Sequence, residues 1–313
     1  MILYHSSCTD GFTAAWAAYK GTGDDEILPV MHGKAPPDVT GKQVVMVDFT
    51  YPKGVLEAMS KLATSILVID HHKTTVEDLA SGDRPWWVNG NPTQYLPANV
   101  FVHLDMDRSG AGMTWDYFHG KGTRPRLIDY VEDRDLWRFK LPFSKEISAF
   151  IHSVDYVVGD GLAVWDSLSA KLDDSDQFRT CKEIGRTLLA AEAKSLHRHV
   201  QWAYETELGG YRVKAVNATV LNSEIAASLA TPTPNDPRAF GVAWSMTEDG
   251  RYRYSLRVST PRSEKSIDVT EVAKLFGGGG HANASGFSSD YLVCPKLGTT
   301  RTTDIGPPGT TVI

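Results

Sequence analysis

Three short, uninterrupted apolar runs near the start of the chain each end in histidine or aspartate, and this pattern restricts the possible folds more than any other feature. The runs and the polar residues after them are 2–4 with His5, 44–47 with Asp48, and 66–69 with Asp70-His71-His72. Such runs are typical of strands buried on both faces of a parallel sheet. Helix-compatible stretches at 12–19 and 51–62 separate the runs, which predicts βαβ units in an α/β fold.

The polar residues at these strand ends should meet at one edge of the sheet, because parallel strands point in the same direction. Ligands of open α/β sheets bind at this carboxyl edge. A carboxylate beside imidazoles suits a divalent cation such as Mn²⁺. The triplet Asp70-His71-His72 alone fits an exposed polar cluster equally well, but three successive strand ends favour a metal site. The first loop also brings His5 and Asp10 to a helix start, a position that favours anions.

The composition of the 313-residue chain limits its class. Apolar residues make up 42% and charged residues 22%, as in ordinary globular proteins. The net charge of −6 argues against tight binding of long nucleic acids, although a local basic face is compatible with it. Cys8, Cys181 and Cys294 are too scattered for a disulfide framework, which favours a reducing, cytoplasmic setting. The start of the chain lacks signal-peptide features, and no apolar run reaches the ~20 residues of a membrane span.

A long helical stretch divides the chain into two domains. Residues 176–208 contain few helix breakers and connect segments of different composition, so we expect a connector helix there. Residues 1–175 would form the domain with the parallel sheet, and residues 209–290 a smaller α/β domain. Residues 291–313 turn rich in Thr, Gly and Pro, which predicts a flexible tail.

One strand of the second domain carries an arginine-rich face. Alternation over residues 251–258 places Arg251, Arg253 and Arg257 on the same side of the strand. Guanidinium groups there suit bidentate contacts with phosphate, and an ordinary solvated face is the alternative.

A run of four glycines precedes His281. It follows a helix expected at 269–276, with Asp268 as its cap. One glycine suffices to end a helix, so the other glycines of the run favour a loop whose bare amides approach an anion.

In their order along the chain, these motifs resemble those of the DHH phosphoesterases, a family that includes RecJ nucleases, nanoRNases and exopolyphosphatases. A carboxylate cluster at 132–135, which alone would fit the solvated end of a helix, also matches. The matching motifs are His5…Asp10-Gly11, Val47-Asp48, Asp70-His71-His72, Asp133-Arg134-Asp135, and the glycine run with His281 and residues 282–287. The glycine run is similar to that of the DHH-associated C-terminal domain. The resemblance covers about residues 1–290 and implies an active site in the cleft between two domains.

The resemblance implies two bound Mn²⁺ ions, with Mg²⁺ as an alternative. The implied ligands are His5 for the first ion, Asp10, His71 and Asp133 (or Asp135) for the second, and Asp48 for both. Asp48 would thus be the central catalytic residue. Asp70 and His72, also assigned to catalysis, would orient these ligands or position the substrate phosphate.

On the substrate side, the resemblance implies phosphate contacts from both domains. The implied residues are Arg257, His281, Gly278, Gly279, Gly280 and, at a helix start of the first domain, Ser109. One departure from the family pattern is Cys8, which stands where many members carry aspartate. Sulfur is a poor ligand for Mn²⁺, so either the first metal site is weaker or Cys8 lies outside it.

Taken together, the motifs and the family resemblance predict a Mn²⁺-dependent phosphodiester hydrolase of the exonuclease type. It would act on short oligonucleotides from an end, through activation of water by two metal ions. The alternatives are a phosphodiesterase for linear or cyclic dinucleotides, a polyphosphatase, and a nucleotide-binding protein that has lost catalysis through Cys8. The expected partner is a short oligonucleotide or another nucleotide-phosphate substrate and not a membrane, and a homodimer stays open.

Overall fold

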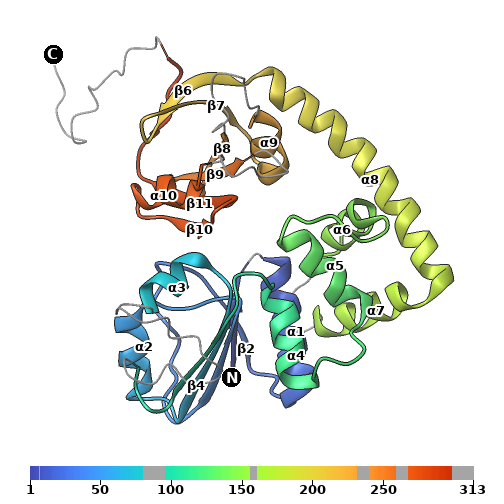
Figure 1. Ribbon diagram of the computed structural model, residues 1–313, viewed down its shortest axis with the longest axis vertical. Helices are drawn as coiled ribbons and strands as arrows, with labels where there is room; N and C mark the ends of the chain where they lie inside the picture. The colour runs from blue at the N-terminus through green and yellow to red at the C-terminus, as the bar shows by residue number, and fades with distance from the viewer. Residues whose placement is uncertain (7, 80–95, 156–160, 231–239, 259–266, 298–313) are drawn as a thin grey trace. The chain divides into compact units, whose positions relative to one another are not determined.

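The computed structural model describes residues 1–6, 8–79, 96–155, 161–230, 240–258 and 267–297. The chain divides into two compact units, Met1–Ala191 and Glu192–Ile313 (Figure 1). The boundary falls within α8 (Ser175–Gln201), in the stretch where the sequence predicts a connector helix. Within the described ranges, no helix has the length and apolarity that crossing a bilayer requires.

The N-terminal unit is built on a five-stranded, fully parallel sheet, which confirms the prediction from the apolar runs. The strand order is β2-β1-β3-β4-β5. The strands are β1 (Ile2–His5), β2 (Ile27–Val30), β3 (Gln43–Val47), β4 (Ser65–Asp70) and β5 (Val100–Leu104). The chain passes from β1 to β2 in one direction and then returns past β1 to β3. The order therefore reverses between β1 and β3, and doubly wound sheets bind ligands at such a switch point.

Helices cover both faces of this sheet and enclose two hydrophobic cores. α1 (Thr9–Thr22) and α4 (Gly110–His119) pack together on one face, and α2 (Lys53–Ser60) and α3 (Lys73–Leu79) cover the other (Figure 1). α5 (Arg126–Asp135), α6 (Ser144–His152) and α7 (Gly161–Asp173) extend the first layer. Phe12 packs edge to face on the buried Trp165, with ring centroids 5.1 Å apart, so aromatic packing fixes the start of α1.

Four charged side chains tie α4 to α5 in a partly buried cluster. Arg108 donates to Glu132 at 2.5 Å and to Asp116 at 3.0 Å. Arg124 bonds to the same two acids, at 2.8 Å to each. Glu132 also accepts the backbone N–H of Ser109 at 3.3 Å, so the cluster fixes the N-terminal end of α4.

The C-terminal unit contains a six-stranded sheet in the order β10-β11-β9-β8-β7-β6. Its pairs are antiparallel except for β7 with β8. The strands are β6 (Tyr204–Leu208), β7 (Tyr211–Asn217), β8 (Phe240–Met246), β9 (Tyr252–Val258), β10 (Gly279–His281) and β11 (Ala284–Ser289). α9 (Asn222–Leu229) and α10 (Val269–Lys274) each close a separate core. Asp268 caps α10 by accepting the Thr270 N–H at 2.9 Å, as predicted.

Two segments of this unit differ from the sequence prediction. Residues 202–208 do not continue the connector helix, because β6 pairs with β7 and buries Thr206 and Leu208. Residues 291–297, predicted as the start of a flexible tail, pack on the sheet. Cys294 is 0% exposed, and the Val293 N–H donates to the Tyr254 hydroxyl at 2.9 Å. The rest of the predicted tail, residues 298–313, lies outside the described residues.

The glycine run after α10 enters a β-hairpin and is not an open loop. β10 pairs antiparallel with β11. A Cβ atom at Gly278 would lie 2.2 Å from the carbonyl oxygen of Gly286, and Gly280 has a φ of +135°. Close packing and backbone conformation in the hairpin therefore account for these two glycines without a ligand.

Candidate metal centre

Asp48 is the centre of the polar cluster at the carboxyl edge of the N-terminal sheet. It follows β3 at the switch point, is 1% exposed and has a left-handed φ of +54°. Its N–H donates to the carbonyl oxygen of Ile69 at 2.9 Å, which fixes the turn out of the sheet. Its Oδ1 lies 3.0 Å from His71 Nε2, and its Oδ2 lies 3.7 Å from His5 Nδ1. The ends of β1, β3 and β4 thus meet at one carboxylate.

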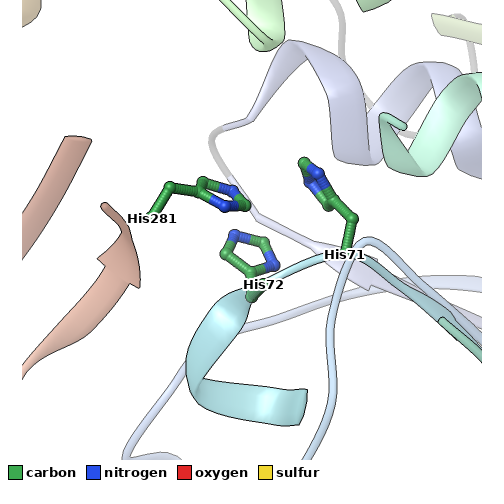
Figure 2. Close-up of side chains that lie close together, drawn as sticks. All are labelled: His71, His72 and His281. Atoms are coloured by element: carbon green, nitrogen blue, oxygen red, sulfur yellow. The ribbon is translucent and has the colours of Figure 1, made fainter. Parts of the chain in front are cut away.

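Asp70 orients the residues that follow β4. It is fully buried, and its Oδ1 accepts the His71 N–H at 2.7 Å and lies 2.7 Å from His72 Nδ1. Its Oδ2 accepts the hydroxyls of Thr50 and Thr75 at 2.6 and 2.7 Å. The two imidazoles lie next to each other before the first turn of α3, with centroids 4.8 Å apart (Figure 2). These contacts suit the supporting role that the family resemblance implies for Asp70.

Asp10, in the first turn of α1, faces the same cluster. Its Oδ2 accepts the Gly110 N–H at 2.7 Å and its Oδ1 accepts the Ala111 N–H at 3.0 Å, so it binds the N-terminus of α4. A Cβ atom at Gly110 would lie 2.6 Å from Asp48 Cβ, and only glycine permits this close approach. His71 Nε2 lies 3.7 Å from Asp10 Oδ2.

The acidic end of α5 contributes Asp135 to the cluster. Asp135 Oδ2 lies 3.6 Å from His71 Nε2. The carboxylate of Asp133 instead accepts the backbone N–H of Lys140 at 3.0 Å and the Ser144 hydroxyl. The structure therefore corrects the choice of Asp133 as a ligand and favours Asp135, the alternative.

Three groups of donor atoms lie at this sheet edge, and two of them have no residue in common. In each group the donor atoms lie within 4.8 Å of one another. The two separate groups are His5, Cys8 and Asp48, and Asp10, His71 and Asp135; the third, Asp48, Asp70, His71 and His72, overlaps with both.

Three buried atoms of these groups lack a hydrogen-bond partner among the described residues: His5 Nδ1, Asp48 Oδ2 and Asp135 Oδ2. Buried polar atoms normally have a partner. Three such atoms at one edge, on imidazole and carboxylate groups, fit a divalent cation such as Mn²⁺.

Opposing pKa shifts accompany this geometry. Burial acts to raise the pKa of Asp48, but contacts with His5 and His71 outweigh burial and hold the pKa well below its usual value. Burial acts to lower the pKa of His71, but Asp135 and Asp48 outweigh it and raise that pKa well above its usual value. Burial, together with Asp135 and Asp48, also raises the pKa of Asp10. Ligation requires a neutral imidazole at His71, so cation binding there works against the raised pKa of His71.

His32 lies at the same edge, although the sequence prediction did not include it. Its ring centroid is 5.5 Å from that of His5 and 4.5 Å from that of Phe49. It follows the end of β2 by two residues. The sequence prediction considered the residues after three strands of this sheet. The same reasoning, applied to the residues after β2, would have identified His32.

The predicted substrate residues occupy different settings, and only Ser109 is at odds with its predicted role. Ser109 is 0% exposed and its hydroxyl accepts the Gly112 N–H at 3.1 Å, so it caps α4 and does not present its hydroxyl to phosphate. In the C-terminal unit, Arg257 donates to the Ser223 hydroxyl at 2.7 Å. His281 lies on β10 and is partly exposed, as are Gly279 and Gly280 before it.

Comparison with known proteins finds a DHHA1 domain at residues 210–296. An uncharacterized protein of Acanthamoeba polyphaga mimivirus is 24% identical, in an alignment that covers 92% of this chain and 67% of the relative. RecJ from Thermus thermophilus, solved with Mn²⁺, is 14% identical with a TM-score of 0.44, over 92% of this chain and 49% of RecJ. A pGpG-specific phosphodiesterase from Vibrio cholerae is 13% identical with a TM-score of 0.42, over 92% of each chain.

The DHHA1 domain occupies the part of the chain where the glycine run predicts it. The N-terminal unit supplies the remaining motifs of the family in their order, and at one sheet edge they form a cluster that suits divalent cations. The C-terminal unit therefore contains a DHHA1 domain, and the N-terminal unit has the α/β architecture that the resemblance to DHH phosphoesterases implies.

Proposed function

We propose that this protein is a metal-dependent phosphoesterase of the DHH family, and more narrowly a Mn²⁺-dependent phosphodiesterase that degrades short oligonucleotides from an end, with Mg²⁺ as the alternative ion. The position of Asp48 between two donor groups carries the proposal. Its Oδ1 lies 3.0 Å from His71 Nε2, and its Oδ2 lies 3.7 Å from His5 Nδ1. A carboxylate with one oxygen toward each group is suited to bridge two cations, and paired cations are typical of phosphodiester hydrolysis.

The residues around Asp48 have separate tasks in this proposal. Cations at the two donor groups would activate the attacking water and stabilise charge on the phosphate. Asp48 holds the two groups together, and Asp10 fixes the start of α4 against them. Asp70 bonds to His72 Nδ1 at 2.7 Å, so we assign His72 Nε2 to the substrate phosphate. This division follows the usual pattern in which a carboxylate orients a functional histidine.

The preference for short substrates rests on charge and on the DHHA1 domain. A chain with a net charge of −6 lacks the basic excess of proteins that bind long nucleic acids. Arg257 and His281 would hold a terminal phosphate or the next nucleotide, and the backbone of Gly279 would contribute an amide. A cytoplasmic location and a homodimer remain predictions of the sequence.

Product analysis on end-labelled RNA and DNA oligomers of graded length, with Mn²⁺, tests the proposal. We expect mononucleotides to appear first, from one end, and faster from short oligomers than from long ones. The Asp48→Asn variant serves as the control for contaminating nucleases. A purified, folded, Mn²⁺-loaded protein that hydrolyses no oligomer would refute the assignment.

The same assay separates the alternatives. Turnover restricted to pGpG-like or cyclic dinucleotides would identify a dinucleotide phosphodiesterase, and release of inorganic phosphate from polyphosphate would identify a polyphosphatase. A silent parent whose Cys8→Asp variant is active would identify a binding protein that has lost catalysis.

A further inference from the structure

We infer that His5, Cys8 and Asp48 form a nitrogen–sulfur–oxygen site that selects Zn²⁺ or Co²⁺ over Mn²⁺, so that the two donor groups hold different metals. The inference deepens the proposed function and rests on it for the presence of two cations. It assigns a ligand role to Cys8, the residue at which this chain departs from the family pattern.

The position of Cys8 is the first observation. It precedes α1, and its side chain is partly buried. Its sulfur, one imidazole nitrogen of His5 and one oxygen of Asp48 all lie within 4.8 Å of one another. The alternative that Cys8 lies outside the first metal site therefore does not describe this arrangement.

The unpaired atoms beside Cys8 are the second, independent observation. Asp48 is 1% exposed, and its Oδ2 has no hydrogen-bond partner among the residues that the structure describes. The same holds for His5 Nδ1. These two atoms are 3.7 Å apart, too far for a hydrogen bond. Two ligands of one cation keep a similar separation, roughly 3–3.7 Å for metal–ligand bonds of about 2.1–2.3 Å.

The second group lacks sulfur. Asp10, His71 and Asp135 offer two carboxylates and one imidazole, which suit Mn²⁺ or Mg²⁺. The first group offers thiolate, imidazole and carboxylate, a set that zinc sites use and that Mn²⁺ disfavours. One sulfur atom therefore makes the two positions chemically distinct. Cation binding there forms a metal–sulfur bond and releases the thiol proton to water.

Cobalt spectroscopy on the full chain tests this assignment directly. The protein is stripped of metal, loaded with Co²⁺ in the presence of a phosphine reductant, and scanned in the near ultraviolet. We expect a sulfur-to-cobalt charge-transfer band in the parent that Cys8→Ser and Cys8→Asp both lack. Cys181→Ala is the matched control, because Cys181 is buried in the N-terminal core and belongs to neither donor group.

Metal competition gives a second measurement. After dialysis against Zn²⁺ with Mn²⁺ in large excess, which offsets the general preference of imidazole and carboxylate sites for zinc, we expect about one zinc per parent chain. In Cys8→Asp, the zinc affinity should fall by more than the roughly 10–100-fold that loss of a supporting residue costs, and the zinc content should fall with it. Cys8→Asp retains a ligand, so it keeps the test decisive where Cys8→Ser fails to fold.

The outcomes separate this inference from the proposed function. A parent without the charge-transfer band, or with equal zinc content in parent and Cys8→Asp, overturns the metal selectivity even where Mn²⁺-dependent hydrolysis is present. A cysteine-dependent band in a protein that hydrolyses no oligomer supports the site and refutes the proposed substrate.

Discussion

The left-handed backbone of Asp48 limits which residues can replace it. Its φ of +54° is a conformation that aspartate and asparagine adopt more readily than alanine. We predict that Asp48→Asn keeps the fold but lowers the hydrolysis rate about 10³-fold or more, because an amide is a poor bridge between cations. Asp48→Ala should lose the same activity and also about 1 kcal/mol of stability. Urea unfolding of the metal-free variants compares them, and equal stabilities would contradict the backbone argument.

Asp133 and Asp135 offer a matched pair of substitutions. We predict that Asp135→Asn lowers Mn²⁺ affinity by more than about tenfold without lowering the stability of the metal-free protein. Asp133→Asn should leave Mn²⁺ affinity unchanged and cost about 1–3 kcal/mol of unfolding free energy, because Ser144 and the Lys140 N–H lose a charged acceptor. Titration calorimetry and urea unfolding measure both quantities. The reverse pattern would restore Asp133 as the ligand.

The sequence predicts well which residues at the ends of strands belong to the site, but it predicts poorly which residues on helices do. His5, Asp48 and His71 could be predicted to meet because a parallel sheet gathers its carboxyl ends whatever the loops do. Asp133 and Asp135 are about 200° apart around the helix axis, so the rotation of α5 decides which of them points inward. That rotation is set by tertiary packing, which a single sequence does not reveal.

At the scale of elements, the approach of α4 to Asp48 depends on Gly110. We predict that Gly110→Ala displaces the start of α4 and lowers Mn²⁺ affinity and activity, because its Cβ would lie 2.6 Å from Asp48 Cβ and 2.9 Å from Asp10 Oδ2. Gly54→Ala in α2 is the control, since a Cβ there meets nothing within 4 Å. The control should keep activity and stabilise the protein by about 0.4–1 kcal/mol. Equal behaviour of the two variants would contradict the close approach.

The charged cluster between α4 and α5 should make stability depend on pH. Burial acts to raise the pKa of Asp116, but Arg124 and Arg108 outweigh it and hold the pKa below its usual value. Its contribution is therefore fully present above the unfolded pKa of about 3.9 and is lost as pH falls through the lower folded pKa. We predict that Asp116→Asn costs about 1–3 kcal/mol at neutral pH, and that the difference from the parent shrinks below about pH 4.

Urea unfolding across this pH range checks the prediction. Glu183→Gln removes an exposed partner of Arg186 and is the control, with an expected effect below about 0.5 kcal/mol at every pH. A cost for Asp116→Asn that stays constant down to pH 3 would show that the ion pairs are not its source.

Elements could be predicted where one simple pattern fills a segment: an uninterrupted apolar run, a helix-compatible stretch or a clear alternation. The parallel strands, α1 and the alternation of β9 follow from such patterns. β6 was missed because five residues after a long helix carry too short an alternation to be recognised. The hairpin of β10 was missed because glycine fits a ligand loop and a tight strand pair equally well.

At the scale of the whole molecule, each unit encloses its own hydrophobic cores. We therefore predict that thermal unfolding shows two transitions and that Mn²⁺ raises only the one that belongs to the N-terminal unit. At a free Mn²⁺ concentration about 100 times the dissociation constant, the stabilisation should be about 2.7 kcal/mol. Differential scanning calorimetry measures both transitions. Asp48→Asn should abolish the Mn²⁺ shift, and an equal shift of both transitions would contradict the assignment.

The sequence anticipated the two-part organisation because the long helix α8 separates a parallel sheet from a largely antiparallel one. It did not anticipate that residues 291–297 belong to the second core, since Thr, Gly and Pro dominate the tail that follows. Average composition over the whole tail does not separate residues 291–297 from the residues after them. The burial of Cys294 depends on its individual contacts, which composition does not reveal.

The close spacing of Asp10, Asp48 and Asp135 serves cation binding but lowers the thermostability of the metal-free protein. Burial, together with repulsion from neighbouring carboxylates, raises the pKa values of Asp10 and Asp135, so their ionised forms lower the stability of the metal-free fold. Replacing Asp135 by asparagine removes one of these charges and, with it, a ligand. A screen for heat-resistant variants carried out in the presence of a chelator would therefore enrich inactive proteins, whereas the same screen with divalent cations would retain the acids.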